Sequence, residues 1–488
     1  MIDEQTALVI EGISHDGRGI ARIGKKQSAE NPLVVFVQGA LPGQTVRIHV
    51  IKKASHYLDA VVDCVIEEHG LRSPLCLAEE QCGGCPLQRL PYAKQLFWKK
   101  EMLCSALKRI GHIDHAFLDD SVDTCLASPL TECYRNKMEF AFGKDERSQK
   151  ILLGLRHKNS HSVVTPNNCI LIDKKAFQLT QYLEEEAQKS GLAPYTLLPR
   201  KELQQRKKGT GFWRFAIIRK GLSPASLQEG FWLLLLTSPC SQKEGRVVQQ
   251  IGERLLSQFD WLKAFVHEER YAHDTLPIGE KRRLVLSSEK DQASHLALML
   301  AKTPFHLDVS SFFQVNLAAA DILAQKILEA CPNDLPLHAQ LIDLYAGVGA
   351  PGLLLAPRFA NVYAVEANPR SAELANRNAN RLSLPHYHCL ATKVTPDVLA
   401  DYAQAEETIC LIDPPRNGLD SKTLHHLKDY APRSILYVSC NPATLARDIA
   451  LLQDKYLLEQ VTAIDLFPHT AHVESVSLLT LKKDSLAR

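Results

Sequence analysis

Short apolar runs separated by turn signals dominate the first 66 residues of the chain. Four of them are strand-like: residues 6–13, 34–37, 46–51 and 60–66. Short strands at this spacing predict a small closed β-barrel of the OB type, a fold that often binds RNA. Six basic residues of this segment could contact phosphate groups: Arg18, Arg22, Lys25, Lys26, Lys52 and Lys53. A solvated basic rim is the alternative interpretation of these residues.

Helical periodicity replaces the short strands at residues 92–111, where apolar side chains recur every three to four positions. From about residue 308 onward, strand-like and helical patterns alternate. A long helix is expected over residues 317–330, followed by a strand, a glycine turn and a helix over residues 340–356. This alternation predicts a doubly wound parallel sheet. The closing run 473–481 suggests paired last strands at one edge of that sheet.

Composition and charge narrow the class of protein. A length of 488 residues exceeds one domain, and a hydrophobic content of 45% with a charged content of 23% is ordinary for a soluble protein. The net charge of +2 gives no global basic field, so any nucleic-acid binding must come from local patches. The acidic start is unlike a signal peptide, and the apolar run 231–236 is too short to cross a membrane. We therefore expect a cytoplasmic, multidomain protein without a membrane segment.

Thirteen cysteines, several of them clustered, indicate a reducing compartment and metal or catalytic roles instead of disulfides. Cys76, Cys82 and Cys85 are spaced as C-x5-C-x2-C, which is typical of metal ligands. A four-ligand site needs one more thiolate, and Cys169 in a turn-rich loop is the candidate. Spacing does not separate an iron–sulfur cluster from zinc, because both take four thiolates. A redox pair at Cys82 and Cys85 is the alternative, which the third cysteine disfavours.

A glycine turn with a following acid predicts a nucleotide-containing cofactor. The segment Asp343–Gly349 would let the backbone pass close to a ligand, and it contains Tyr345, Gly347 and Gly349. Glu366 stands at the end of the next expected strand, where a carboxylate can accept hydrogen bonds from two ribose hydroxyls. The third glycine of a dinucleotide fingerprint is missing, which favours S-adenosylmethionine over NAD.

The sequence Asp413-Pro-Pro-Arg416 ends the strand expected over residues 408–412. The prolines stiffen the loop and cannot donate hydrogen bonds, so Asp413 should be held at the carboxyl-terminal edge of the sheet. In amino-methyltransferases an aromatic residue follows this D-P-P sequence, so Arg416 argues against an exocyclic amine as the target. An ordinary proline turn is the alternative.

Cys440 follows the next expected strand, 435–438, and precedes a helix that Asn441 can cap and Pro442 can begin. Ligands of α/β folds bind at this position, and the helix dipole there should favour the thiolate. A small buried core residue is the alternative interpretation of Cys440.

His472 and Glu474 are two residues apart and should share one face of the last strands. Glu474 is flanked by Val473 and Val476, so we expect it to be partly buried and able to pair with a cysteine nucleophile as a base. For His472, a satisfied core histidine is the alternative.

These segments together resemble the RNA uracil-C5 methyltransferases. Asp413–Gly418, Ile435–Thr444 and Asp465–Glu474 match the family's DPPR-x-G, x-Y-x-S-C-N-x-x-T and D-x-F-P-x-T-x-H-x-E motifs. Phe312–Asn316 is similar to its F-x-Q-V-N motif, whose glutamine lies at the cofactor and uracil site. The resemblance covers nearly the whole chain and implies that the N-terminal barrel is a TRAM domain.

The resemblance implies a role for each candidate residue. Cys440 would be the catalytic nucleophile and Glu474 the catalytic base. The S-adenosylmethionine site would contain Gln314, Tyr345, Gly347, Gly349, Glu366 and Asp413. The ligands of a [4Fe–4S] cluster would be Cys76, Cys82, Cys85 and Cys169. The chain departs from the family at Ala350, where relatives often carry Asn, and at Leu390–Lys393, where an acidic residue commonly meets the adenine.

The resemblance also implies a multidomain α/β fold in three parts, with the 92–125 helical segment packed on the catalytic domain despite its distance in sequence. The expected parts are a TRAM barrel at 1–67, a central α+β domain with the cluster at 68–93 and 126–307, and a Rossmann-like class I methyltransferase domain at 94–125 and 308–488.

The implied reaction is methylation of uracil C5, a carbon too weakly nucleophilic to attack a methylsulfonium directly. Addition of Cys440 to C6 would make an enolate that is nucleophilic at C5. Gln314 would stabilise the enolate, and Asp413 would accept a hydrogen bond from N3–H, which cytosine lacks. Glu474 would then remove the C5 proton. The base has to be reached edge-on, so it should be flipped out or taken from an unstacked loop.

The expected partner is RNA, bound by a monomer. The barrel and the cluster together favour 23S ribosomal RNA by analogy with the family, and the T-loop uridine of tRNA is the alternative. A second alternative is a non-catalytic RNA-binding or chaperone protein on a methyltransferase fold, which the intact pair of Cys440 and Glu474 disfavours.

Overall fold

The computed structural model describes most of the chain as two compact units. The described residues are 7–24, 32–158, 160–165, 169–197, 209–288, 294–395, 398 and 407–482. Unit 1 comprises Met1–Leu75, Cys85–Pro129 and Ala318–Arg488, and unit 2 comprises Cys76–Gly84 and Leu130–Leu317. The barrel thus shares unit 1 with the C-terminal sheet, whereas the sequence suggested three domains. The domain boundaries given above stay a prediction.

The N-terminal barrel of unit 1 is closed by its first segment. Its described strands are β1 (Leu8–Val9), β2 (Gly12–Ile13), β3 (Gly19–Ile23), β4 (Leu33–Gln38), β5 (Gln44–Lys53) and β6 (Tyr57–Glu68), in the order β1-β5-β6-β4-β3-β2. β1 pairs with β5 and β2 pairs with β3, so the segment 8–13 joins both edges of the sheet. The expected strand over residues 6–13 is therefore divided into two short strands, which pair at different edges of the sheet.

The six basic residues proposed to contact phosphate groups fall into three groups. Arg18 forms ion pairs with Asp16 and Asp59, and Arg22 forms one with Glu11. Two lysines at the end of β5 are exposed: Lys52 and Lys53. Lys25 and Lys26 lie outside the described residues. Among the described candidates for phosphate contacts, the two lysines are therefore the most accessible.

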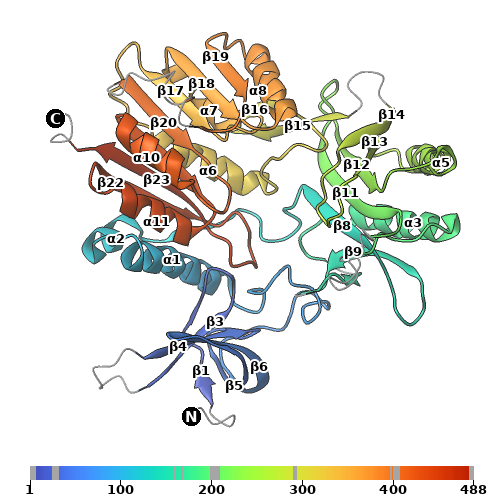
Figure 1. Ribbon diagram of the computed structural model, residues 1–488, viewed down its shortest axis with the longest axis horizontal. Coiled ribbons are helices and arrows are strands. Elements are labelled where there is room, and N and C mark those ends of the chain that lie inside the picture. The colour runs from blue at the N-terminus through green and yellow to red at the C-terminus, as the bar shows by residue number, and fades with distance from the viewer. Residues whose placement is uncertain are drawn as a thin grey trace. The chain divides into compact units, whose positions relative to one another are not determined.

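A doubly wound sheet forms the larger part of unit 1, as the sequence predicted (Figure 1). Its described strands are β17 (Gln340–Leu344), β18 (Asn361–Glu366), β19 (Tyr387–Ala391), β20 (Thr408–Ile412), β21 (Ser434–Ser439), β22 (Tyr456–Ile464), β23 (Glu474–Leu481) and β7 (Cys125–Leu126), in the order β19-β18-β17-β20-β21-β23-β22-β7. The first five strands of that order are parallel, and β23 is antiparallel to both of its neighbours.

Helices cover this sheet, and one of them comes from a distant part of the sequence. The helices of the C-terminal region are α6 (Leu317–Ala330), α7 (Ala350–Leu355), α8 (Pro369–Arg381), α10 (Ser421–Tyr430) and α11 (Pro442–Leu452). α1 (Tyr92–Arg109) packs against α11, and the short α2 (His115–Ser121) follows it (Figure 1). The core between these elements includes Leu103 and Leu107 of α1 together with Ile435 of β21.

Unit 2 is an α+β unit built on a second sheet. Its described strands are β8 (Lys137–Lys144), β9 (Ile151–Arg156), β10 (Val163–Val164), β11 (Trp213–Leu222), β12 (Glu229–Thr237), β13 (Leu262–Glu269), β14 (Lys281–Ser287), β15 (His295–Leu300) and β16 (Thr303–Asp308). α3 (Lys174–Ser190) and α5 (Gln242–Gln258) bury their apolar faces against this sheet. In the part of the chain that the structure describes, no helix has the length and apolar character of a membrane span.

Candidate active site

The candidate residues of unit 1 gather where the order of the parallel strands reverses. β17 lies between β18 and β20, so the strand order reverses at β17. In doubly wound sheets, ligands bind in the crevice beyond the carboxyl ends of the strands at this position. The glycine turn follows β17, and Asp413 follows β20. Cys440 follows β21, and Glu474 begins β23. The amide of Asp413 donates to the carbonyl oxygen of Leu344 over 3.3 Å, which ties the ends of β20 and β17 together.

The pairing of two strands sets Cys440 opposite Glu474. Ser439 of β21 is in register with Ser475 of the antiparallel β23, so the next residue of one strand faces the preceding residue of the other. The hydroxyl of Ser475 also donates to the carbonyl oxygen of Ser439. Cys440 is partly exposed, whereas only 3% of Glu474 is exposed. The structure therefore brings together the two residues expected to be nucleophile and base.

Two acids and burial keep Cys440 protonated. Burial, Glu474 and Asp413 raise the pKa of the Cys440 thiol to about 11, and Arg416 opposes them. The expectation that the helix N-terminus makes Cys440 a thiolate is therefore wrong for the protein without RNA. The reason is that both acids come from other strands, and together with burial they outweigh the helix end.

The two acids are themselves perturbed. Burial raises the pKa of Asp413 to about 7, although part of this residue remains exposed. Burial and Asp413 raise the pKa of Glu474 well above its usual range, against the influence of Arg416. Carboxyl groups with strongly perturbed pKa values are typical of sites that move protons. The site therefore contains two neighbouring acids whose pKa values both lie above the usual range of a carboxyl group.

The loop that carries Asp413 is fixed to the helix that follows Cys440. Asn441 caps α11 and donates from its side chain to the carbonyl oxygen of Arg416 over 3.0 Å. The buried carboxylate of Asp448 accepts from the amide of Leu419 and from the hydroxyl of Tyr437. These bonds connect the loop to β21 and α11 at both ends, so it is more than an isolated proline turn.

His472 lies beside this loop but outside the last strand. β23 begins at Glu474, so the two residues do not share one face of a strand, and that expectation is wrong. Nε2 of His472 is 3.1 Å from Nη2 of Arg416, and the His472 amide donates to the hydroxyl of Thr470. The reason is that strand pairing ends at Ile464 and Glu474. His472 thus contacts Arg416, which itself influences Cys440 and Glu474.

The turn after β17 is suited to a cofactor. Tyr345, Gly347 and Gly349 have φ values of 65°, 57° and 87°, so three positions of this short turn are left-handed. The amide of Gly347 donates to Glu366 at the end of β18 over 3.0 Å, and the amide of Asn368 donates to the other oxygen of that carboxylate. A Cβ at Gly347 would meet no heavy atom within 4 Å in the described structure, so space lies in front of the turn. An adenosine-containing ligand fits this arrangement of backbone and acid.

The positions that depart from the family lie beside this turn. Ala350 is buried as the first residue of α7. The segment Leu390–Lys393 covers the end of β19 and continues beyond it. The buried Asp343 near the turn has a pKa raised well above its usual range, by burial and then by Asp413 and Glu366. Burial next to Asp413 and Glu366 therefore disfavours the ionised form of Asp343, the third carboxyl group of this region.

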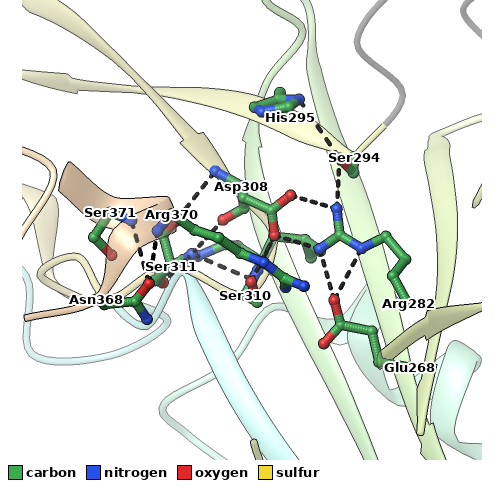
Figure 2. A network of polar contacts seen from close by, with 12 residues as sticks. Glu268, Arg282, Ser294, His295, Asp308, Ser310, Ser311, Asn368, Arg370 and Ser371 are labelled. Carbon is green, nitrogen blue, oxygen red and sulfur yellow. Dashed lines mark hydrogen bonds and ion pairs between the residues drawn. The ribbon is translucent and has the colours of Figure 1, made fainter. Parts of the chain in front are cut away.

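Gln314 belongs to unit 2, where a polar network holds the segment that carries it (Figure 2). The guanidinium of Arg282 lies between Glu268 and Asp308, with contacts of 2.7 Å to each. The buried Arg219 donates to the carbonyl oxygen of Ser311 over 2.6 Å. The side chain of Asn136 then donates to the carbonyl oxygen of Gln314 itself. Arg282, Arg219 and Asn136 thus hold the segment 308–314 by an ion pair and hydrogen bonds. The role of Gln314 stays a prediction.

The four cysteines expected to bind a cluster are divided between the units. Cys76, Cys82 and Cys169 belong to unit 2, and Cys85 begins a segment of unit 1. Burial raises the pKa of Cys169 to about 11, and the neighbouring Cys76 and Cys82 contribute to this rise. Among the described residues, no three or more His, Cys, Asp or Glu side chains are arranged to hold a metal ion. The metal site therefore stays a prediction from the sequence.

Sequence reasoning missed two buried polar residues of α1 that contact the loop before Glu474. Gln95 and Lys99 are fully buried, and each forms hydrogen bonds with residues about 370 positions later in the chain. The only sequence signal was a lysine and a glutamine on the apolar side of an amphipathic helix, which is unusual without a buried partner.

Comparisons with known proteins found matching domain families and relatives. The family model described as tRNA (Uracil-5-)-methyltransferase matches residues 393–482, and the TRAM domain model matches residues 3–62. A protein of Nitratidesulfovibrio vulgaris named uncharacterized RNA methyltransferase is 32% identical over 466 residues, which cover 94% of each chain. One of the same description from Staphylococcus aureus is 28% identical over 482 residues, or 98% of each chain.

A solved structure shares the fold over nearly the whole length. The crystal structure of Pyrococcus abyssi tRNA (uracil-54, C5)-methyltransferase in complex with S-adenosyl-L-homocysteine aligns with a TM-score of 0.68. The alignment covers 97% of this chain and 100% of that one, at 23% sequence identity. This likeness shows a common architecture across both units.

Proposed function

The chain belongs to the RNA uracil-C5 methyltransferase family, and we propose that it transfers a methyl group from S-adenosylmethionine to C5 of a uracil in 23S ribosomal RNA. The observation that carries the proposal is the meeting of Cys440, Glu474 and Asp413 at the carboxyl-terminal edge of one sheet, next to a left-handed glycine turn. A non-catalytic RNA-binding protein would have no need for a thiol and a buried acid placed opposite each other.

The cofactor site is proposed at the turn after β17. When bound, S-adenosylmethionine supplies an electrophilic methyl group. Gly347 and Gly349 would let the backbone approach it closely, and the remaining lone pairs of Glu366 would accept from its ribose hydroxyls. Tyr345 and Asp413 border the same crevice, and Gln314 completes the proposed set.

Cys440 would add to C6 of the uracil. A sulfur–carbon bond forms, and the electrons of the C5–C6 double bond pass to C5 and the adjacent carbonyl as an enolate. The thiol proton must leave first, and Asp413, with a pKa of about 7, is the neighbouring acid that is partly ionised at neutral pH. Asp413 is also the candidate acceptor for uracil N3–H.

Glu474 would complete the reaction as the base. Once C5 carries the methyl group, the carboxylate of Glu474 removes the C5 proton, the double bond reforms and the bond to Cys440 breaks. Burial and Asp413 raise the pKa of Glu474, which makes its ionised form a stronger base than an exposed carboxylate.

The RNA class is the part of the proposal that needs a direct test. The TRAM barrel together with the proposed cluster supports ribosomal RNA by analogy with the family. The alternative is the T-loop uridine of tRNA, which the names of the matching family model and of the Pyrococcus abyssi structure suggest. Mapping of 5-methyluridine in a deletion strain distinguishes them, since loss from 23S rRNA alone supports the proposal and loss from tRNA alone contradicts it.

We propose further that Cys76, Cys82, Cys85 and Cys169 bind a [4Fe–4S] cluster. Support comes from the C-x5-C-x2-C spacing of the first three and from the position of Cys169 in a turn-rich part of the sequence. Protein purified without oxygen should contain about four irons per chain, with thiolate-to-iron absorption near 400 nm. Cys82→Ser should lose the iron and weaken RNA binding, whereas Cys104→Ser on α1 should retain both. Stoichiometric zinc in place of iron would contradict this assignment.

A further inference from the structure

The loop between β22 and β23 leads directly into Glu474. It spans residues 465–473, and the strands on either side are in register at Ile464 and Glu474. A hairpin connection of this length does not by itself fix the residue that follows it. Strand pairing places Glu474 opposite Cys440, and the contacts of the loop limit how far the start of β23 can shift.

Lys99 of α1 holds the first half of this loop from inside the protein. Its ammonium group is 2.5 Å from Oδ1 of Asp465 and donates to the carbonyl oxygen of Phe467 over 3.0 Å. The same carboxylate oxygen accepts from the amide of Phe467. Both charged side chains are fully buried. Lys99 thus holds the carbonyl group of Phe467 directly and, through Asp465, the amide of the same residue.

Gln95, one helical turn earlier, holds the second half. Its side-chain oxygen accepts from the amide of His469 over 2.8 Å, and its nitrogen is 3.2 Å from Nδ1 of the same residue. The amide of Leu87 donates to the carbonyl oxygen of His469 over 2.9 Å. His469 has a φ of 71°, a conformation that needs such support in a residue other than glycine. Every polar group of the His469 backbone is therefore bonded to a segment far away in sequence.

The end of the loop is packed against the barrel. Ala471 is buried in a small apolar cluster with Ile13 and Leu41 of the barrel and with Leu87 and Met102. A Cβ on Gly17 of the barrel would lie 3.4 Å from that of Ala471. Residues 465, 467, 469 and 471 of the loop are thus each held by hydrogen bonds or packing, the last of them three residues before Glu474.

A buried ion pair is a costly way to stabilise a fold. Burial lowers the pKa of Lys99 against the opposing influence of Asp465, which shows how poorly the site solvates the charge. Apolar residues of similar size usually stabilise such a position equally well. A lysine and a glutamine, unlike apolar side chains, can fix backbone carbonyl and amide groups in one geometry. This favours a positional role over one in stability.

We propose that Lys99 and Gln95 are positioning residues that aim Glu474 at the C5 proton by fixing the loop 465–473. The proposal rests on the proposed function, because it assumes that Glu474 acts as the base. The segment 92–109, distant in sequence from every motif of the site, thereby becomes part of the catalytic machinery without contacting the substrate.

The test compares variants that remove the polar contacts while keeping the volume. Gln95→Met removes neutral hydrogen bonds only. The double variant Lys99→Met with Asp465→Asn removes both charges and keeps an acceptor for the Phe467 amide, so no unpaired charge is left buried. Lys94→Met is the matched control, because Lys94 is an exposed residue of the same helix. Each full-length protein is assayed with substrate RNA and S-adenosylmethionine, and the covalent protein–RNA adduct is measured on denaturing gels.

A misplaced base should slow the step after methyl transfer. We expect kcat to fall roughly tenfold to a hundredfold in both variants with KM for RNA unchanged, and the adduct to accumulate. Lys94→Met should behave as the parent protein. A purely structural role would lower the melting temperature and the active fraction without accumulation of adduct, which would overturn the proposal. If the parent protein itself formed neither adduct nor 5-methyluridine, the proposed function would fail instead.

Discussion

At the scale of single residues, the reactivity of Cys440 is governed first by its burial and then by the acids beside it. Burial and the acids Glu474 and Asp413 disfavour the thiolate, and Arg416 favours it. A thiol that stays protonated until a substrate is bound is protected from oxidation and stray alkylation, because the thiolate is the reactive form. This arrangement suits a nucleophile that must attack only a correctly seated base.

Alkylation of Cys440 by iodoacetamide should therefore rise with pH up to about 11 in the protein without RNA. Above the pKa of Glu474 its carboxylate repels the thiolate, so Glu474→Gln should lower the pKa of Cys440 and speed alkylation at pH 9. Mass spectrometry of the Cys440 peptide measures both effects. Glu459→Gln, an exposed change on β22, is the control. A midpoint near 8.5 that does not respond to Glu474→Gln would contradict this account.

The sequence was sufficient to predict that the candidate residues meet at one edge of the sheet and insufficient to predict their ionisation. Cys440 and Asp413 could be identified because each follows a buried strand of a doubly wound sheet. The protonated state of Cys440 could not, since it depends on Glu474, which reaches it through the pairing of β21 with β23. Lys99 was missed for the same reason, because its partner Asp465 is distant in sequence.

At the scale of elements, the glycine turn after β17 combines two constraints. Gly347 and Gly349 are both left-handed, but their surroundings differ. A Cβ at Gly349 would lie 2.7 Å from the hydroxyl of Tyr387 and 2.9 Å from Leu353, whereas Gly347 faces open space. The left-handed backbone therefore disfavours substitution at both glycines, and close packing disfavours it further at Gly349.

Alanine substitutions separate these constraints. Gly347→Ala should cost about 1 kcal/mol of unfolding free energy, because only the left-handed conformation is strained. Gly349→Ala should cost roughly 1–3 kcal/mol more, because the added methyl group also displaces neighbours. Denaturant unfolding measures the difference. Equal losses in the two variants would mean that the packing around Gly349 is looser than described.

The end of β5 is the element of the barrel best placed to meet RNA. Lys52 and Lys53 are exposed there, whereas Arg18 and Arg22 are engaged in ion pairs. Lys52→Gln with Lys53→Gln should weaken RNA binding, and each lost contact should reduce the slope of log K against log salt by about 0.7. Arg22→Gln should change the slope less. An unchanged slope in the lysine variant would show that these residues do not contact phosphate.

At the scale of the whole molecule, the order of strands and helices along the C-terminal sequence was predictable, whereas the assignment of distant segments to one compact unit was not. The alternation of strands and helices after residue 308 sufficed to predict the doubly wound sheet. The association of α1 with this sheet followed from family resemblance, because no local pattern in 92–109 points to α11. Residues 150–305 carry no motif, so the sheet of unit 2 could not be derived.

Three separate parts of unit 1 meet at one loop. The barrel, α1 and the segment 85–90 all contact the loop that precedes the proposed base. The barrel, which is expected to bind RNA, is thus in contact with the loop 465–473 that leads to the proposed base, Glu474. Chemistry at Cys440 remains the central claim on which these assignments depend.

That claim is tested most directly by incubating Glu474→Gln with substrate RNA and S-adenosylmethionine and analysing the product under denaturing conditions. The account predicts a stable protein–RNA species whose cross-linked peptide contains Cys440, together with loss of all methylation in Cys440→Ala. Methylation retained by Cys440→Ala, or an adduct attached to another residue, would contradict it.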